Sequence, residues 1–153
     1  SLDAAANAAV PIVLMHALGD PKTMQDDPTY DNVLLDVYDW LEERIEVCAA
    51  AGIDRSRLVV DPGIGFGKNL AHNLALLRGL SLFHGLGCPI LLGASRKSFI
   101  HKLRPSSDPQ GRLGGALASV LAGRAQGVPV FRVHDVHETI EALGVAEAIA
   151  NAI

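Results

Sequence analysis

The sequence is poor in cysteine, which limits the kinds of site and the cellular setting that it can have. It holds 2 cysteines, Cys48 and Cys88, and they show no paired spacing. This pattern argues against a disulfide framework and against a zinc site built on cysteine. A reducing, cytoplasmic setting is expected, because disulfides rarely persist there.

Long apolar runs and an excess of basic residues are also lacking. No run approaches the roughly 20 apolar residues that span a bilayer, and the alanine-rich start has no basic signal-peptide region. The formal net charge of −4, with scattered basic residues, argues against nucleic acid or an anionic membrane as the main partner. The 153 residues fit one domain, but an initiating Met is absent, so we expect the chain to begin inside a longer protein.

What the sequence does contain is a short apolar strand that ends in a carboxylate and a glycine-rich turn, over residues 58–68. Pro62 favours an extended backbone at Asp61, which places the acid at the carboxyl end of the strand. In α/β folds this end is where ligands bind. The three alternating glycines predict a close approach of the backbone to another group, although a solvated aspartate on a tight turn is an equal alternative.

Two common nucleotide motifs do not fit this stretch. A Rossmann fingerprint requires a third glycine where Lys68 stands, and a Walker loop requires a glycine at Pro62 and Ser or Thr at Asn69. The glycine-rich turn is therefore not expected to bind a nucleotide in either of these ways.

The rest of the chain alternates between strand and helix patterns. Continuous apolar runs predict strands over residues 11–16, 58–60, 89–93 and 128–133. Periodic patterns predict helices over residues 4–9, 32–51, 70–84, 95–103, 112–125 and from 135 onward. The expected helix caps are Asp31 or Asn32, Ser95, and a capping box of Asp135 with Glu138. Gly79 and Gly144 are expected to interrupt helices.

This alternation predicts an α/β fold with a parallel sheet covered by helices. A doubly wound sheet of four strands is one candidate, and half of a (β/α)8 barrel is the other. Polar residues follow all four strands, at His16, Asp61, Ser95 and His134, which favours convergence at the mouth of a barrel. Because a complete barrel needs about 250 residues, we expect the N-terminal half to be absent.

Four motifs at these strand ends closely resemble those of dihydropteroate synthase, in order and in spacing. They are Met15-His16, residues 61–68, Ser95-Arg96-Lys97 and residues 132–135. Ala17-Leu18 departs from the Met that is commoner after the Met-His pair. The resemblance implies that residues 1–153 form a single partial pterin-binding domain, the C-terminal half of a TIM barrel with about four βα units.

The resemblance also implies an activity. The family is a transferase that joins 6-hydroxymethyl-7,8-dihydropterin diphosphate to p-aminobenzoate, releasing diphosphate and forming 7,8-dihydropteroate for folate biosynthesis. A cytoplasmic homodimer, a sulfonamide target and a Mg2+ cofactor are expected with it. The Mg2+ ligand is expected in the missing N-terminal half, with no metal ligand in this chain.

By the same resemblance, Asp61 holds the pterin edge, Arg132 and His134 receive the diphosphate, and Ser95, Arg96 and Lys97 face the aminobenzoate. The full expected substrate-binding set is Met15, Asp61, Phe66, Gly93, Ser95, Arg96, Lys97, Arg132 and His134, of which Lys97, Arg132 and His134 are expected to be catalytic. Met15, Phe66 and His16 could equally be core or structural residues.

The spacing and charge of Arg132 and His134 support their assignment to an anion site independently of the resemblance. Arg132 and His134 lie two apart on a predicted strand, so their side chains share a face. A buried arginine without a partner costs several kcal/mol, which favours an anion site over an inert core pair. The small residues Gly114, Ala118 and Ala122 recur every fourth position, and they predict either a homodimer contact or packing inside the barrel wall.

Three other readings compete with the synthase. The pterin domain of a corrinoid methyltransferase shares the barrel and the carboxylate, but it does not need Ser95-Arg96-Lys97. A metallohydrolase could use His16, Asp61 and His134 as ligands. A half-barrel that serves only as an assembly module is the non-enzyme alternative, and the 153-residue chain alone is expected to be inactive.

Overall fold

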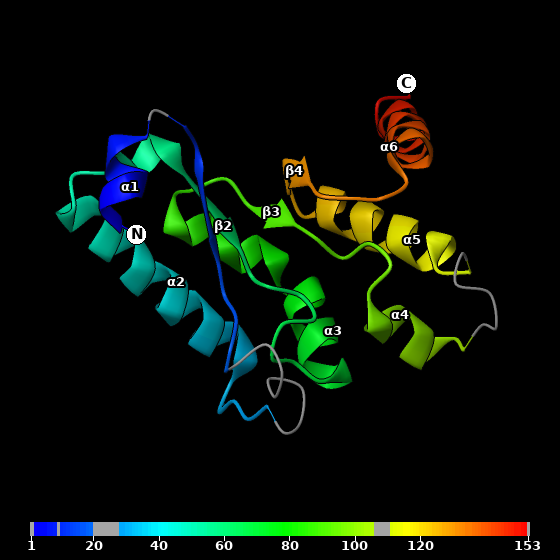
Figure 1. Ribbon diagram of the computed structural model, residues 1–153. Helices are drawn as coiled ribbons and strands as arrows, with labels where there is room; N and C mark the ends of the chain where they lie inside the picture. Colours follow the sequence, from blue (N-terminus) through cyan, green and yellow to red (C-terminus); the bar gives the residue numbers. More distant parts are fainter. Residues whose placement is uncertain (1, 9, 20–27, 106–110, 153) are drawn as a thin grey trace.

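The structure, a computed structural model, describes residues 2–8, 10–19, 28–105 and 111–152. Its elements are α1 (Leu2–Asn7), β1 (Ile12–Met15), α2 (Val33–Ala50), η1 (Arg55–Arg57), β2 (Leu58–Asp61), α3 (Leu70–Arg78), η2 (Leu80–Leu86), β3 (Leu91–Leu92), α4 (Ser98–Leu103), α5 (Leu113–Ala125), β4 (Val130–Phe131) and α6 (Val136–Ala150) (Figure 1). The predicted alternation is confirmed. Among the described residues, no helix combines the length and apolar character that a membrane span requires.

The four strands lie side by side in chain order and are parallel. β1 pairs with β2, β3 pairs with β4, and a bridge between Val60 and Ile90 joins the two pairs. In a doubly wound sheet the order of the strands changes direction at a switch point inside the sheet. In a (β/α)8 barrel each strand lies beside the next one in the chain, which is the order found here. Figure 1 shows α1 and α6 at opposite ends of this row, so the expected partial barrel is an open one.

The last two strands are shorter than the sequence predicts. β3 and β4 contain only 2 residues each. The pairing continues one step further, because the N–H of Arg132 donates to the carbonyl oxygen of Leu92 at 3.0 Å. Arg132 is thus held at the carboxyl end of β4, although it lies just outside the strand.

The core lies between the strands and the helices that follow them. On α2, the face formed by Val37, Leu41 and Ile45 has no exposed area. The apolar periodicity of residues 32–51 also predicts Leu34 and Tyr38 on this face, but both are only half-buried and pack against its margin. The buried face is thus rotated by roughly a few tens of degrees around the helix axis from the expected one, and α2 is amphipathic as expected.

Two of the expected helix boundaries are confirmed. The side chain of Asn32 accepts hydrogen bonds from the N–H groups of Leu34 and Leu35, at 3.1 and 3.3 Å, and so caps α2. Gly79 ends α3 and separates it from η2. For the helix expected over 4–9, α1 ends at Asn7, and position 9 lies outside the described residues.

Two other expectations about α6 are wrong. Asp135 precedes the helix but makes no side-chain capping bond, because its carboxylate pairs with Arg96 instead. Gly144 does not interrupt the helix, which continues through it to Ala150. A glycine inside a helix costs only about 1 kcal/mol relative to alanine, so the surrounding turns maintain the helix.

Candidate active site

Asp61 ends β2, as the sequence predicts, and its carboxylate is buried. Oδ1 accepts a hydrogen bond of 2.8 Å from the N–H of Gly63, and Oδ2 lies 3.9 Å from Nη2 of Arg132. Burial raises the pKa of this carboxyl, while the Gly63 N–H and nearby cations oppose the rise; the cations are those of Lys97, Arg132 and Lys68. A buried carboxylate facing cations contradicts the alternative of a solvated aspartate.

The glycine-rich turn after Asp61, residues 62–68, is called the glycine loop below. A Cβ on Gly63 would lie 1.8 Å from the carbonyl oxygen of His16, and one on Gly67 would lie 2.6 Å from that of Leu18. Both glycines also have positive φ, at 71° and 64°. The predicted close approach is therefore confirmed, and the group approached is the chain that follows β1.

Side chains from other elements hold the glycine loop in place. The hydroxyl of Tyr30 donates to the carbonyl oxygen of Gly67 at 2.8 Å. The side-chain oxygen of Asn73, on α3, accepts from the N–H of Gly65 at 2.7 Å. The loop is thus a fixed surface beside Asp61.

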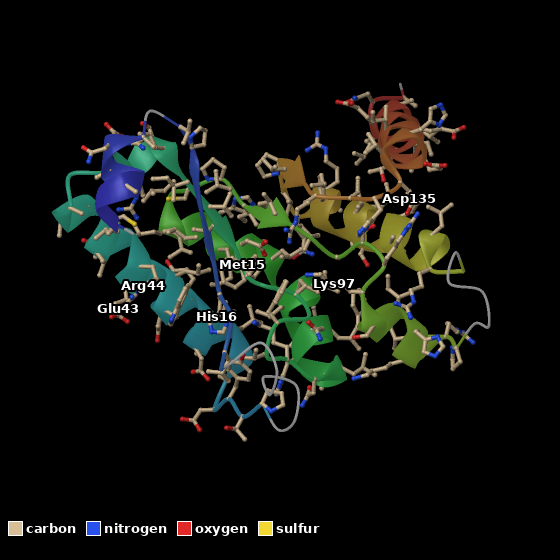
Figure 2. The ribbon with its side chains drawn as sticks, in the orientation of Figure 1. Met15, His16, Glu43, Arg44, Lys97 and Asp135 are labelled. Atoms are coloured by element: carbon tan, nitrogen blue, oxygen red, sulfur yellow. The ribbon has the colours of Figure 1, made fainter. Side chains whose placement is uncertain are left out.

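Lys97 lies against this surface, just before α4 (Figure 2). Its Nζ donates to the carbonyl oxygen of Ile64 and lies 4.5 Å from the centre of the Phe66 ring. Burial lowers the pKa of Lys97 to about 8; Asp61 opposes this effect and Arg132 adds to it. The half-buried Phe66 ring and Lys97 are consequently positioned as one unit.

Ser95 does not cap α4, contrary to expectation. α4 begins at Ser98 with Lys97 in the capping position and no capping side chain. The Ser95 hydroxyl instead accepts from the N–H of His134 at 3.2 Å and lies 3.1 Å from His134 Nδ1. The hydroxyl therefore joins the ends of β3 and β4, a contact that residue spacing alone does not reveal.

Five of the predicted site residues surround one pocket of about 270 Å³. Its lining residues are Gly93, Ser95, Lys97, Arg132, Val133 and His134. A Cβ on Gly93 would lie 3.0 Å from Nη2 of Arg132, so the glycine leaves room for the guanidinium. Two cationic side chains, a hydroxyl and an imidazole at one opening form an arrangement suited to an anionic oxygen-rich group.

The remaining predicted site residues are not among those that line this pocket. Met15 ends β1 next to Asp61 in the register of the strands, and it is half-buried. Arg96 does not line the pocket, because its guanidinium forms an ion pair with Asp135. Its backbone has a positive φ of 56°, and its carbonyl oxygen accepts from Nη1 of Arg112 at 2.8 Å.

Sequence reasoning missed the importance of one residue, Lys68, to which it assigned no role although Lys68 closes the motif over residues 61–68. Lys68 is 1% exposed, and its Nζ lies 2.9 Å from His16 Nδ1 and 2.9 Å from the carbonyl oxygen of Phe66. Burial lowers the pKa of Lys68 to about 7 and that of His16 to about 4. A lysine placed directly after a closely packed glycine turn was the available signal.

The described residues contain no group of three His, Cys, Asp or Glu side chains that could hold a metal ion. His16, Asp61 and His134 therefore do not form the ligand set of a metallohydrolase. The ring of His16 is instead enclosed by Trp40, Tyr30 and Lys68. The assignment of His16 as a buried structural histidine is favoured over that of a ligand.

Known proteins are similar to this chain in sequence and in fold. The family model of pterin binding enzymes matches residues 1–134. The dihydropteroate synthase of Escherichia coli strain K12 is 47% identical over 152 residues, covering 99% of this chain and 54% of that protein. The dihydropteroate synthase of Haemophilus influenzae is 41% identical and covers 99% of this chain and 55% of that protein.

Solved structures give the same picture. The Yersinia pestis dihydropteroate synthase in complex with a sulfonamide drug has a TM-score of 0.94 at 45% identity, covering 99% of this chain and 55% of that one. The Stenotrophomonas maltophilia dihydropteroate synthase with active site-bound imidazole has a TM-score of 0.95 at 40% identity, with coverage of 99% and 57%. The chain thus spans about half the length of the curated relatives it matches. From its match over residues 1–134, the chain belongs to the family of pterin binding enzymes.

Proposed function

We propose that the chain supplies half of the active site of a dihydropteroate synthase, which joins 6-hydroxymethyl-7,8-dihydropterin diphosphate to p-aminobenzoate. The observation that carries the proposal is the meeting of Asp61, Lys97 and Arg132 at the carboxyl ends of neighbouring parallel strands. Asp61 lies 3.9 Å from Arg132, and Lys97 lies between the glycine loop and the same pocket. The dihydropteroate synthase relatives support the same reaction.

The pterin site is proposed at Asp61. Its carboxylate can accept paired hydrogen bonds from the N–H and NH2 groups of the amino-pyrimidinone edge, each worth about 1.5–3 kcal/mol. Met15 is the register partner of Asp61, and Phe66 lies on the glycine loop beside it. Their apolar surfaces are available to pack on the flat pterin ring.

The diphosphate site is proposed at Arg132 and His134. Both line the 270 Å³ pocket, and the side chain of Arg132 is 60% exposed, so its guanidinium is accessible to an anion. Arginine provides a planar fork of donors that matches phosphate oxygens. Phosphate sites after the last two strands of (β/α)8 barrels are common.

The aminobenzoate site is proposed at Ser95, Arg96 and Lys97. The Ser95 hydroxyl and the Lys97 ammonium face the pocket, so they can orient the carboxylate and the amine. Arg96 contributes only after its guanidinium leaves Asp135, with which it is paired in the structure.

The chemistry proposed is dissociative. The C–O bond between the pterin methylene and the diphosphate breaks, and its electron pair leaves with the diphosphate. The arylamine nitrogen then forms a C–N bond to the resonance-stabilised methylene cation and loses a proton. Arg132 and His134 stabilise the departing charge, while Lys97 and Phe66 align the two rings. No general base among these residues is required.

The Mg2+ that the resemblance implies does not fit the described residues, since no group of three acidic, histidine or cysteine side chains lies together there. We therefore propose that its ligands belong to the part of the enzyme that this chain does not cover. The contacts proposed above involve protein groups alone.

A homodimer through α5 also remains a proposal. α5 packs closely inside the fold at Gly115, whose Cβ would lie 2.3 Å from Ile100 Cγ2, and at Gly123, whose Cβ would lie 2.8 Å from Leu92 Cδ2. The predicted stripe of Gly114, Ala118 and Ala122 lies one residue earlier and is exposed.

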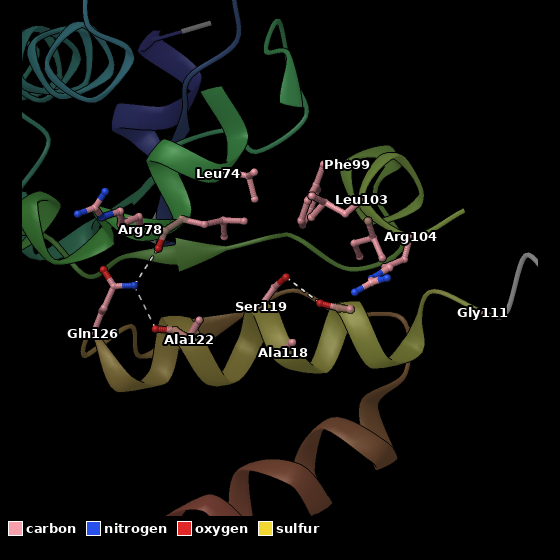
Figure 3. Close-up of a pocket in the computed structure, with 13 residues that line it drawn as sticks. Leu74, Arg78, Phe99, Leu103, Arg104, Gly111, Ala118, Ser119, Ala122 and Gln126 are labelled. Carbon is pink, nitrogen blue, oxygen red and sulfur yellow. Dashed lines mark hydrogen bonds between the residues drawn. The ribbon is translucent and has the colours of Figure 1, made fainter. Parts of the chain in front are cut away.

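Ala118 and Ala122 line a groove of about 550 Å³ between α3, α4 and α5 (Figure 3). A second copy could therefore approach α5 closely. Replacing Ala118 with Trp should weaken the dimer in light scattering, whereas Ala71→Trp, on exposed α3 surface, should not.

A cytoplasmic location is proposed as well, supported by the two free, buried cysteines, Cys48 and Cys88.

The activity is tested in a fused barrel, in which the segment of the E. coli relative that this chain does not cover precedes residues 1–153. The two substrates are supplied, and formation of dihydropteroate and diphosphate is followed by chromatography. Product formation that depends on Lys97 and Arg132 supports the proposal. A folded fused barrel that binds pterin but forms no product would support the alternative of a pterin-binding module.

A further inference from the structure

Lys68 is a buried cation that the proposed reaction does not use. Lys68 does not line the 270 Å³ pocket. Its side chain is among the most deeply buried in the described part of the chain. Burying a charge costs several kcal/mol unless partners compensate. A hydrophobic side chain would fill the same space without that cost, so the ammonium needs an explanation.

The partners of Lys68 belong to two segments that meet only in the folded chain. Nζ donates to the carbonyl oxygen of Phe66 within the glycine loop, at 2.9 Å. It also lies 2.9 Å from Nδ1 of His16, directly after β1. The face of the Tyr30 ring lies 5.9 Å away, and Asp61 supplies the opposing charge.

His16 is itself fixed, so it can serve as an anchor. Its N–H donates to the carbonyl oxygen of Asp61 at 3.0 Å, and its ring meets Trp40 edge-on with 5.1 Å between the ring centres. While Lys68 is an ammonium it can only donate, so His16 then accepts at Nδ1 and carries its proton at Nε2. Through its contacts with His16 and with the carbonyl oxygen of Phe66, Lys68 therefore ties the glycine loop to the fixed end of β1.

Lys68 and Lys97 donate to carbonyl groups that lie two residues apart in the glycine loop. Lys68 binds the carbonyl oxygen of Phe66, Lys97 binds that of Ile64, and the Phe66 ring lies 4.5 Å from the Lys97 ammonium. A shift of Phe66 would displace both the ring and the cation that it faces.

We propose that Lys68 is a positioning residue, which fixes the glycine loop against His16 so that Phe66 and Lys97 are held in register with the reacting groups. This inference rests on the proposed synthase function for its catalytic consequence, but the link between Lys68 and Lys97 is a property of this chain. Lys68 acts through these residues and does not touch the substrates.

The test replaces Lys68 with Met in the fused barrel, because Met has similar length and no charge. Lys68→Met removes the charge but also leaves His16 Nδ1 and the carbonyl oxygen of Phe66 without their donor, so the melting temperature should fall. At temperatures where the variant stays folded, turnover should fall at least tenfold in kcat, with KM for the diphosphate substrate within threefold of wild type. Lys102→Met, on the exposed surface of α4, is the matched control and should change neither quantity.

A second readout does not depend on activity. Competitive acetylation over a pH series reports the pKa of the Lys97 amine, which burial lowers to about 8. In Lys68→Met the loosened loop admits water and the neighbouring Lys68 charge is lost, so the pKa of Lys97 should rise toward 10.5. If the wild-type fused barrel makes no product, the proposed function fails, while this labelling result still decides the link between the two lysines.

Two His16 variants keep the inference testable if Lys68→Met does not fold. Asn offers an amide oxygen near the position of Nδ1, and Leu offers no acceptor. We expect His16→Asn to retain turnover within threefold and His16→Leu to lose at least tenfold. Equal turnover of these two variants, or a Lys68→Met enzyme with wild-type kcat and an unchanged Lys97 titration, would overturn the inference.

Discussion

The guanidinium of Arg132 lies 3.9 Å from the carboxylate of Asp61, although the two residues follow different strands and differ in burial. The Asp61 side chain is 3% exposed and that of Arg132 is 60% exposed, so Arg132 approaches the carboxylate from the solvent side. A diphosphate that binds Arg132 therefore competes with Asp61 for the same cation. The proposed pterin site at Asp61 and the proposed diphosphate site at Arg132 therefore meet at this contact. Separate substitutions of the two residues can distinguish the two sites.

Asp61→Asn should abolish tight pterin binding while the fold is retained. An amide oxygen can still accept from the Gly63 N–H, but the side chain carries no charge and accepts only one of the two donated pterin bonds. The expected loss is about 2–4 kcal/mol, or roughly 30- to 1000-fold in affinity. Calorimetry with a pterin on the fused barrel measures it, with Asp39→Asn on exposed α2 surface as the control. Affinity within threefold of wild type would refute the role of Asp61.

Arg132→Ala should weaken binding of the pterin diphosphate and leave binding of the bare pterin almost unchanged. Because the Arg132 side chain is largely exposed, its removal should cost little stability. Both ligands are compared by calorimetry, and Arg124→Ala on α5 serves as the control. Equal weakening of the two ligands would mean that Arg132 supports the barrel and does not recognise the diphosphate.

His16 should make the free energy of unfolding depend on pH in the acid range. Burial first, and then the nearby Lys68, lower its pKa from 6.5 to about 4, while a backbone hydrogen bond and then Asp36 act in the opposite direction. The unfolded chain takes up the proton first as the pH falls, so the stabilisation is complete above pH 6.5 and is lost between 6.5 and about 4. The loss should be on the order of 1–3 kcal/mol.

Urea unfolding of the fused barrel at several pH values measures this effect. His16→Asn has no titrating ring, so the difference between it and wild type separates the contribution of His16 from that of the carboxyl groups that titrate in the same range. Parallel pH profiles of the two proteins would exclude the predicted contribution of His16.

The sequence predicts the strand ends well because the relevant signals are local. Asp61 follows a continuous apolar run and precedes proline, and both features depend only on neighbours in the chain. The parallel order of the strands then brings Ser95, Arg132 and His134 to the same edge, where the structure finds them lining one pocket. Local patterning and topology therefore account for the greater part of the candidate site.

The residues that sequence reasoning placed wrongly depend on contacts between distant segments. Ser95 resembles a helix cap, but His134 offers its hydroxyl a partner that only the folded sheet supplies. Asp135 likewise pairs with Arg96 rather than with its own helix. Lys68 resembles an exposed lysine until the glycine loop folds onto the end of β1 and encloses it.

The last prediction is that the 153-residue chain alone makes no dihydropteroate, although the proposed diphosphate and aminobenzoate contacts are present. The outer strands expose apolar residues, with Val13 of β1 47% and Val130 of β4 39% exposed. On α6, Ile140 and Ile149 are 65% and 72% exposed. Such open sheet edges and apolar faces favour self-pairing or aggregation over a stable monomer.

Activity should fail for a second reason, because transition-state stabilisation collapses when members of a cooperating set are missing. About half of the relatives' length lies outside this chain, and with it the expected Mg2+ ligand. Turnover is measured with the chain alone and after adding the uncovered segment of the E. coli relative in trans. Reassembly should restore product formation, whereas the same segment added to the Arg132→Ala chain should not. Turnover by the chain alone, at a rate near that of the fused barrel, would show that the reaction needs nothing beyond these residues and that the active site is misplaced here.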